Sequence, residues 1–428
     1  MINRGEVPEG YKKTKVGIIP EDWEVKRLGE IAEIGSSKRI MAHEYVPEGI
    51  PFYRSKEIIE KSLGNKIEER LYISRERYQE IASQFPIPQE GEILITAVGT
   101  LGIPYLIRRR DLPFYFKDGN LIWFREIQDV NKEYLIYLWL SEAIIRQIEN
   151  TFSGSSQKAL TIEKVNKLKF PNAPLPEQKK IAQILSTWDQ AIELKEKLIE
   201  EKKEQKKGLM QKLLTGEVRL PGFDGEWEEV RLGDIGEFST SSVNKKIEEG
   251  ERIINLVNYM DVYNNNFIDN SIDYMKVSAS ESQISKFSLK IGDVLFTPSS
   301  ETADDIGHSA VVKKIDKKNL LYSYHLVRLR FNKEIDINFK GYVFNNKNVL
   351  REFTRLASGA TRYTLTLKDF RNTTVYIPKS LQEQKAIAQI LSTADKEIEL
   401  LEKELEQLKL QKKGLMQLLL TGIIRVKS

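Results

Sequence analysis

Two short loops, one in each half of the chain, combine small hydroxyl residues with basic ones. The first reads SSKR at 36–39 and the second reads SSVNKK at 241–246. Hydroxyl, amide and cationic side chains are the groups that contact phosphate oxygens and base edges in nucleic acids. The pattern therefore makes these loops candidates for DNA contact, although solvated surface loops have the same composition. The candidate residues are Ser37, Lys38, Arg39, Asn244 and Lys245.

Three further pairs of segments carry side chains of the same kind at matching places in the two halves. YRSK (53–56) matches NLVNY (255–259), SSQK (155–158) matches ATRY (360–363), and Asn120 and His325 begin matching strands. Aromatic rings next to cations can stack on bases while the cations bind phosphates. Solvated loops remain the alternative for each. The candidates are Arg54, Lys56, Asn120, Gln157, Lys158, Asn258, Tyr259, His325, Arg362 and Tyr363.

No residue pattern for catalysis or for cofactor binding is found. His43, His308 and His325 are scattered, and the chain has no cysteine, so we expect no metal site. There is no P-loop, no glycine-rich cofactor loop and no [DNS]-P-P-[FYW] methyltransferase signature. The acidic residues of PEDWEVK (20–26) are crowded into one segment, whereas nuclease ligands come from separate strands. We therefore expect a protein without enzymatic activity and without a cofactor.

The composition is that of a globular chain with little excess charge. Of 428 residues, 40% are hydrophobic and 30% charged, and the formal net charge is +4. No apolar run reaches the roughly 18 residues of a membrane helix. The absence of cysteine fits a reducing compartment, so a cytoplasmic location is expected. Because the charge is so low, we expect the isolated chain to bind DNA weakly unless partners contribute.

Short apolar runs bounded by turn signals predict the same order of elements in both halves. EILITAV (92–98), PYLIR (104–108) and NLIWFR (120–125) are typical of strands, and residues 133–151 of an amphipathic helix. In the second half the predicted strands are 293–298, 309–315 and 325–331, and the predicted helix is 339–358. The order indicates an α+β fold in each half, with loops that differ more than the frame. A shared frame with divergent loops is what we expect of two domains that recognise different sequences.

The elements that must position these loops are two long helices of nearly the same sequence. EQKKIAQILST (177–187) matches EQKAIAQILST (383–393), and 29 of the 41 positions from 176 and from 382 are identical. Flanking segments repeat at similar offsets, for example WEVKRLGEI (23–31) and WEEVRLGDI (227–235). A period of this length is too long for a solenoid. It indicates duplication of a whole domain together with its helix.

Both helices carry apolar residues at alternating spacings of four and three, which is a heptad seam. The seam residues of the first helix are Ile181, Leu185, Trp188, Ile192, Ile199, Leu209 and Leu213, with Lys195, Lys202 and Lys206 interrupting them. Those of the second are Ile387, Leu391, Ala394, Ile398, Leu401, Leu405, Leu408, Leu415 and Leu419, with Lys412 interrupting. One such helix cannot bury its seam alone. The natural partner is the other copy, in an antiparallel coiled coil within the chain around a pseudo-two-fold axis. A coiled coil used only for homodimerisation is the alternative.

The chain resembles the specificity subunits of Type I restriction-modification systems. The segments that carry the resemblance are 19–31, 174–185, 206–216, 381–392 and 412–426, which span nearly the whole chain. The resemblance implies two target-recognition domains, each reading half of a bipartite, gapped, asymmetric site in double-stranded DNA. It also implies that the paired helices set the gap and dock two methyltransferase subunits, which restriction and translocase subunits join. A helix of about 39 residues is roughly 58 Å long, about 17 base pairs of duplex.

Two other classes of protein remain open at this point. One is a coiled-coil adaptor whose globular ends bind proteins, which salt-sensitive binding to duplex DNA would distinguish. The other is an enzyme that both recognises and methylates DNA, which the missing cofactor motifs disfavour. The predicted divisions are a lead segment 1–22, a first recognition domain 23–175, a spacer helix 176–216, a linker 217–226, a second recognition domain 227–381, a distal spacer helix 382–422 and a tail 423–428.

Overall fold

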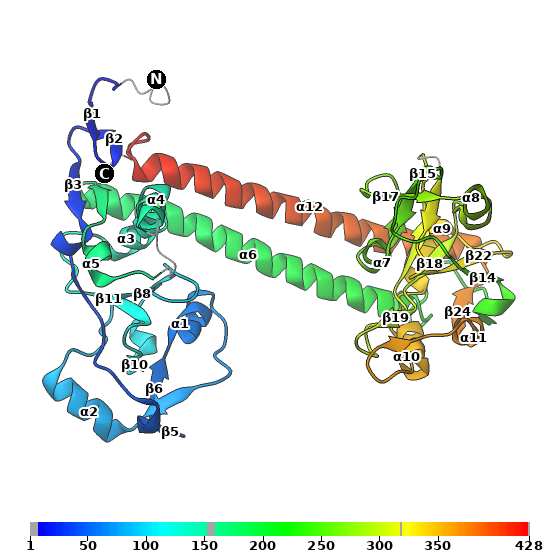
Figure 1. The fold of residues 1–428 in the computed structure, drawn as a ribbon, viewed down its shortest axis with the longest axis horizontal. Coiled ribbons are helices and arrows are strands. Elements are labelled where there is room, and N and C mark those ends of the chain that lie inside the picture. The colour runs from blue at the N-terminus through cyan, green and yellow to red at the C-terminus, as the bar shows by residue number, and fades with distance from the viewer. Residues whose placement is uncertain (1–6, 152–158, 317–318, 427–428) are drawn as a thin grey trace. The chain divides into compact units, whose positions relative to one another are not determined.

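The chain forms two compact units that share two long helices. The computed structural model describes residues 7–151, 159–316 and 319–426. Unit 1 combines residues 1–194 with 405–428, and unit 2 consists of residues 195–404. The long helices α6 (Leu175–Leu213) and α12 (Leu381–Leu420) each contribute one part to each unit (Figure 1). Each unit is α+β, as predicted.

Each unit has a main sheet, a smaller sheet and a two-stranded ladder that lies next to a long helix in sequence. The main sheet of unit 1 has the order β4 (Glu33–Gly35), β11 (Leu121–Arg125), β8 (Ile93–Thr96) and β9 (Pro104–Leu106). Its smaller sheet has the order β10 (Tyr115–Phe116), β6 (Ile50–Tyr53), β7 (Leu71–Ile73) and β5 (Tyr45–Val46). The remaining pairs are β1 (Tyr11–Thr14) with β2 (Gly17–Pro20), and β3 (Glu24–Arg27) with β12 (Lys169–Asn172).

Unit 2 repeats this plan. Its main sheet has the order β14 (Gly236–Thr240), β22 (Val327–Phe331), β18 (Val294–Phe296), β20 (Ser309–Val312) and β16 (Phe267–Ile268). Its smaller sheet has the order β17 (Met275–Ala279), β15 (Arg252–Val257) and β21 (Leu320–Tyr322). The remaining pairs are β13 (Trp227–Arg231) with β24 (Thr374–Pro378), and β19 (Ser299–Ser300) with β23 (Tyr363–Thr364).

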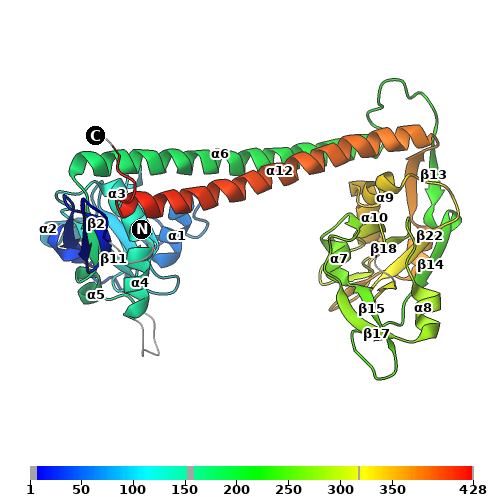
Figure 2. The ribbon, with the colours of Figure 1, turned by 90° about the horizontal axis from the view of Figure 1, so that it is seen from above.

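Short helices cover the sheets of both units (Figure 2). Those of unit 1 are α1 (Ser55–Ser62), α2 (Arg75–Gln84), α3 (Lys132–Trp139), α4 (Glu142–Asn150) and α5 (Ile162–Asn166). Those of unit 2 are α7 (Tyr259–Tyr263), α8 (Glu281–Phe287), α9 (Ile337–Val343), α10 (Lys347–Leu356) and α11 (Leu367–Asn372). The 3-10 turns are η2 (Leu28–Glu30), η3 (Ala42–Glu44), η4 (Arg109–Asp111) and η5 (Leu232–Asp234).

The central strands of each main sheet are apolar on both faces because each face packs against a separate core. In β8, Ile93 and Ile95 belong to the core that includes α3 and the ends of the long helices, whereas Leu94 belongs to a second core. In β18, Val294 and Leu295 divide between two cores in the same way. Alternate residues of a strand point to opposite faces, so a strand covered on both sides is a continuous apolar run.

The prediction of one continuous helix over 133–151, and of another over 339–358, was wrong. Residues 133–151 form two helices, α3 and α4, because the Ser141 hydroxyl caps the second of them by accepting a hydrogen bond from the Ile144 amide. Residues 339–358 likewise lie in α9 and α10, which are separated at Asn346. The Asn346 side chain accepts bonds from the amides of Asn348 and Val349 at 2.9 and 3.1 Å. A side-chain cap satisfies the free backbone amides of a helix start, so it favours the beginning of a new helix at that residue.

The two long helices run antiparallel within each unit. In unit 2, Lys195 pairs with Glu404 at 2.8 Å and Lys202 with Glu397 at 2.6 Å, so the numbers rise along α6 as they fall along α12. In unit 1, Ile181 and Leu185 share a core with Leu419. The last turns of α12 accordingly lie beside the first turns of α6 (Figure 1). No helix in the described residues has both the length and the apolar character that a membrane crossing needs.

Burial along the seam varies with distance from the domains. The fully buried seam residues are Ile181, Leu185, Ile199, Leu213, Ile387, Leu391, Ile398 and Leu419. The others are half-buried: Trp188, Ile192, Leu209, Ala394, Leu401, Leu405, Leu408 and Leu415. Most of the fully buried positions lie at the helix ends, where the domains cover them.

Two of the seam lysines lie at equivalent positions and make equivalent contacts. In unit 1, Lys412 forms an ion pair with Asp189, and the Tyr137 hydroxyl donates to Asp189 Oδ2 at 2.7 Å. In unit 2, Lys206 pairs with Asp395, whose Oδ2 accepts from the Tyr342 hydroxyl, also at 2.7 Å. Each aspartate thus links the opposite long helix to a domain helix. Burial, with this carboxylate, raises the pKa of both tyrosines, so the hydroxyls stay protonated donors.

A second repeated contact anchors each domain to the start of its long helix. In unit 1, Glu177 accepts from Trp23 Nε1 at 3.0 Å and pairs with Arg425 at 2.9 Å. In unit 2, Glu383 accepts from Trp227 Nε1 at 3.1 Å and pairs with Arg219 at 2.8 Å. Both glutamates are buried in the first turn of their helix, where the helix dipole also favours a carboxylate.

One buried charge in unit 2 has no counterpart in unit 1. Lys340 on α9 is only 6% exposed, and its ammonium donates to the Gly292 carbonyl at 3.2 Å and lies 3.9 Å from the Phe331 ring centroid. Burial lowers its pKa from 10.5 to about 8. The equivalent residue of unit 1 is Leu135. A shift of this size means that burying the charged form costs about 3 kcal/mol.

We therefore expect Lys340→Leu to raise the free energy of unfolding of unit 2 by up to about 3 kcal/mol at pH 7. The unfolded lysine keeps its proton up to about pH 10.4 and the folded one only to about pH 8. The increase in the free energy of unfolding should therefore be full below pH 8 and become smaller as the pH rises towards 10. Hydrogen exchange of the full chain in denaturant measures it, with Leu135→Lys as the reciprocal variant. A gain that is the same at pH 7 and pH 10 would contradict the account.

Candidate nucleic-acid interface

In unit 2, four loops converge on one patch at the end of the main sheet. They follow β14, β15 and β21 and precede β23. The amide of Tyr324 donates to the Val243 carbonyl at 3.2 Å, and the amide of Ser323 to the Val257 carbonyl at 3.0 Å. β23 pairs with β19, with Tyr363 opposite Ser300. Backbone hydrogen bonds thus hold together segments that lie 63 to 81 residues apart in the sequence.

Five of the residues predicted from the sequence meet at this patch. Arg362 Nε donates to Ser299 Oγ at 3.2 Å, and the positive charges of Arg362 and Lys245 both act on His325. Arg362 also acts on Tyr259. Tyr363, on β23, is half-buried, whereas Lys245 and Arg362 are exposed. Two cations, two phenols and an imidazole therefore share one surface.

The surroundings of the patch favour the neutral form of His325 and the protonated form of Tyr259. Burial lowers the pKa of His325 below its usual value, and the nearby charges of Lys245 and Arg362 lower it further. Burial raises the pKa of Tyr259. A neutral imidazole offers one donor and one acceptor, and a phenol offers both functions. Cations can bind phosphates at the same surface while these neutral groups bind base edges.

The two predicted asparagines of unit 2 lie at the margin of the patch. Asn244 is exposed, and its Oδ1 accepts from the Lys246 amide at 3.0 Å. Asn258 is half-buried, and its amide donates to Asp261 at 2.7 Å. Asn258 Oδ1 is buried without a partner among the described residues.

The sequence reading missed several residues of this patch. Tyr324 is 50% exposed, and its ring centroid lies 3.9 Å from that of His325. Ser299 and Ser300 form β19, opposite the predicted Tyr363. An aromatic-histidine pair ahead of a strand, and the hydroxyl-rich run TPSSE after another, are signals that could have found them.

In unit 1, the two described candidate loops lie on either side of β10. Ser37 Oγ donates to the Phe116 carbonyl at 2.7 Å, and the Lys38 amide to the Tyr115 hydroxyl at 2.8 Å. The Lys117 amide donates to the Tyr53 carbonyl at 2.8 Å, which brings in the second loop. The structure therefore brings 36–39 and 53–56 together.

The cations of these loops differ in how they are held. Arg54 pairs with the buried Glu57, and Arg39 pairs with Asp118 at 2.8 Å but stays largely exposed. Lys38 is exposed, with its ammonium 4.7 Å from the Phe85 ring centroid. Lys56 is exposed as well. Lys38 and Lys56 are therefore better placed for an incoming phosphate than Arg54 is.

The remaining predicted residues of unit 1 lie next to these loops or outside the described chain. Asn120 is half-buried, and its carbonyl accepts from the Ala97 amide at 2.8 Å and from Ser55 Oγ at 3.0 Å. Gln157 and Lys158 lie outside the described residues. Among the residues that the structure does describe, no group of three or more histidine, aspartate or glutamate side chains could hold a metal ion.

Comparison with known proteins gives one consistent result. The model of the family described as the Type I restriction modification DNA specificity domain matches residues 20–203 and 224–410. The chain is 29% identical over 449 residues to the "Putative type I restriction enzyme MjaX specificity subunit" of Methanocaldococcus jannaschii, covering 98% of both chains. It is 31% identical over 198 residues to the MjaIX specificity subunit of the same organism, covering 44% of this chain and 42% of that one.

Two solved structures have a similar fold. One comes from work on complex assembly and conformational transition of the type I R-M system; its TM-score is 0.64 at 18% identity, covering 95% of this chain and 99% of that one. The other is the HsdS subunit of Thermoanaerobacter tengcongensis, with a TM-score of 0.53 at 18% identity, covering 95% and 98%. At this level of identity the similarity concerns the fold alone.

Proposed function

Since the chain belongs to the family of Type I restriction modification DNA specificity proteins, we propose that it reads a bipartite, gapped and asymmetric site in double-stranded DNA. One recognition domain, residues 23–175, would read one half and the other, residues 227–381, the second half. The observation that carries the proposal is the patch of unit 2, where Lys245, Arg362 and His325 come together from separate loops. The cations would supply affinity for DNA phosphates, and the polar groups beside them would discriminate between base pairs.

The two units would present different reading surfaces on the same scaffold. The contacts of Glu177 and Asp189 in unit 1 recur with Glu383 and Asp395 in unit 2, while the candidate loops differ. This division suits an asymmetric target, because each surface can differ without altering the support below it. In this proposal the spacer helices, predicted at 176–216 and 382–422, set the gap between the half-sites.

We also propose that the chain has no catalytic activity of its own and acts as a scaffold. Two methyltransferase subunits would modify the DNA, and restriction and translocase subunits would join them. The patch of unit 2 supports this view, since its cations, phenols and imidazole are groups suited to nucleic-acid recognition. A coiled-coil adaptor that binds proteins through its globular ends remains the second candidate, supported by the long helical pair.

Salt-dependent binding to duplex DNA separates the two candidates. We expect the full chain to bind its DNA weakly alone and tightly with the methyltransferase subunit. The logarithm of the binding constant should fall linearly with the logarithm of salt concentration. A protein-binding adaptor would show no such binding with or without the subunit. Tight, specific binding by the chain alone would contradict the role given to the partner.

A further inference from the structure

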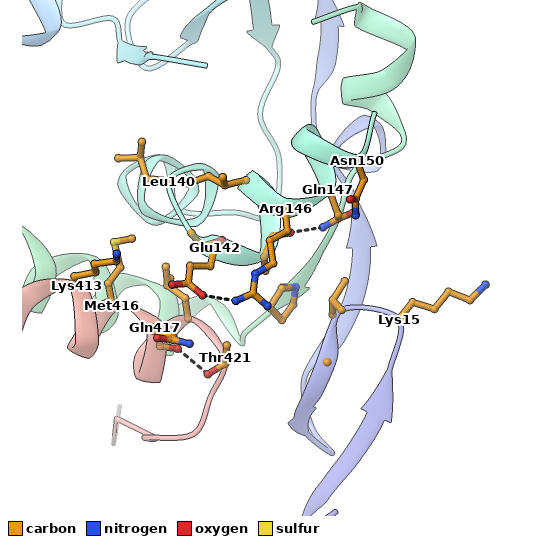
Figure 3. A pocket seen from close by; sticks show the side chains of 17 residues that line it. Lys15, Leu140, Glu142, Arg146, Gln147, Asn150, Lys413, Met416, Gln417 and Thr421 are labelled. Atoms are coloured by element: carbon orange, nitrogen blue, oxygen red, sulfur yellow. Dashed lines mark hydrogen bonds and ion pairs between the residues drawn. The ribbon is translucent and has the colours of Figure 1, made fainter. Parts of the chain in front are cut away.

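Each unit has a groove between a long helix and one short helix of its domain, which is α4 in unit 1 and α10 in unit 2. Groove 1, of about 760 Å³, lies between α4 and the last turns of α12, beside the turn that joins β1 and β2 (Figure 3). Groove 2, of about 690 Å³, lies between α10 and the last turns of α6. Neither groove contains a residue of the candidate DNA patches.

Residues at equivalent positions line the two grooves. From the long helices, Lys413, Met416 and Gln417 of groove 1 correspond to Lys207, Met210 and Gln211 of groove 2. From the domain helices, Ile145 and Arg146 correspond to Leu350 and Arg351. The helices α4 and α10 belong to domains whose candidate loops differ. The lysine, methionine, glutamine and arginine of this lining are the same in both grooves although the candidate loops of the domains differ. This indicates a surface with the same task in both units.

The lining combines an apolar floor with a basic rim. The apolar lining of groove 1 includes Met416 and two aliphatic residues, Leu140, which is 38% exposed, and Ile145, which is 41% exposed. Figure 3 labels Met416 and Leu140. Methionine is flexible and polarisable and adapts to apolar side chains of a partner. In both grooves basic residues outnumber acidic ones. Lys413 and Arg351 have no ion-pair partner within the described part of the chain.

We propose that grooves 1 and 2 each seat one copy of the same partner subunit through an acidic segment with an apolar anchor. The anchor side chain would lie between the methionine and the aliphatic residue, and carboxylates of the segment would face the lysine and the arginine. Charge complementarity and the duplication of the lining select this occupant over a second copy of this chain. The inference rests on the proposed function, in which the partner is the methyltransferase subunit.

Of the positions that line both grooves, one differs in charge, and this difference predicts unequal affinities. In groove 1, Glu142 pairs with Arg146 at 2.8 Å, and the equivalent residue of groove 2 is Lys347. At this position groove 1 has an acid that partly neutralises its arginine, whereas groove 2 has a lysine. An acidic segment should bind groove 2 more tightly at low salt, with a difference that narrows as salt rises.

The test is the stoichiometry of the full chain with the methyltransferase subunit, measured by native mass spectrometry. The wild type should bind two copies, Met416→Glu one, Met210→Glu one, and the double variant none. The controls are Leu410→Glu and Leu400→Glu, which alter residues on α12 that are 63% and 51% exposed and line neither groove. Both controls should still bind two copies. Circular dichroism checks that each variant is folded.

A charge variant then tests the chemistry of the seat. Glu142→Lys should raise the affinity of the weaker site about threefold at low salt, an effect typical of one surface charge pair. Two bound copies in the folded double variant, with DNA methylation intact, would overturn this inference and leave the proposed function standing. A wild-type chain that binds no copy and supports no methylation would instead count against the proposed function. Self-association of the chain that Met416→Glu abolishes would show that the groove seats a second copy, and would also overturn the inference.

Discussion

Replacing Glu383 with alanine is expected to lower the free energy of unfolding of unit 2 by about 3 kcal/mol. The carboxylate is 1% exposed and is shared by the guanidinium of Arg219 and the indole N–H of Trp227. Its removal leaves the buried indole N–H of Trp227 without an acceptor and leaves the guanidinium of Arg219 with the Gly225 carbonyl, at 2.8 Å, in place of a carboxylate. Losing one member of a buried pair costs far more than losing an exposed one, because the remaining group stays desolvated.

Hydrogen exchange of the full chain, read separately for peptides of each unit, measures this loss. The matched control is Glu226→Ala, which breaks an exposed pair with Lys379 and should change stability by less than about 1 kcal/mol. Glu177→Ala should reproduce the effect in unit 1, since it removes the equivalent contact with Trp23 and Arg425. Equal, small losses for Glu383→Ala and Glu226→Ala would show that this contact does not anchor the domain.

Replacing Arg362 with alanine is expected to reduce methylation of the native site about 10- to 100-fold, which is what one good base contact contributes. Arg362 is exposed and held by Ser299, and it lies close enough to His325 and Tyr259 to affect both pKa values. We propose that this side chain reads the second half-site. Its loss should relax selection at one position of that half-site and leave the other half unchanged.

Methylation of a randomised DNA library by the complex measures both rate and sequence preference. Arg362→Lys keeps the charge but not the two-pronged geometry, so it should restore affinity more than selectivity. Arg355→Ala removes the same charge from an exposed position of α10 outside the patch and should leave the motif unchanged. If Arg362→Ala weakens binding equally for all sequences, the residue contacts phosphate rather than a base.

The long helices and the main strands could be predicted because they depend on local patterns of apolar residues. The helices α6 and α12 follow from a heptad seam that occurs twice, and the main strands follow from apolar runs such as those of β8 and β22. The candidate loops were found by comparing the two halves at the same offset. That comparison placed Lys245, His325 and Arg362 before any contact was known.

What could not be predicted depends on contacts between distant segments. Lys206 and Lys412 look like defects of the seam, and only the fold shows each paired with an aspartate that a domain tyrosine also binds. The breaks at Ser141 and Asn346 were missed because each lies within an apolar helical pattern, where a side-chain cap has no strong signal. The ion pair of Arg54 with Glu57 could not be predicted either, because no local pattern shows that Glu57 is buried.

The account depends on the claim that the two domains read separate halves of one DNA site, and a methylation map tests it most directly. The chain would be expressed with its methyltransferase subunit in a host without DNA methylation, and modified bases would be read by long-read sequencing. The account predicts a gapped two-part motif modified once on each strand. Exchange of residues 23–175 for another recognition domain should change one part only. No new methylation, despite an assembled complex and a competent methyltransferase, would contradict the claim and favour a protein-binding adaptor.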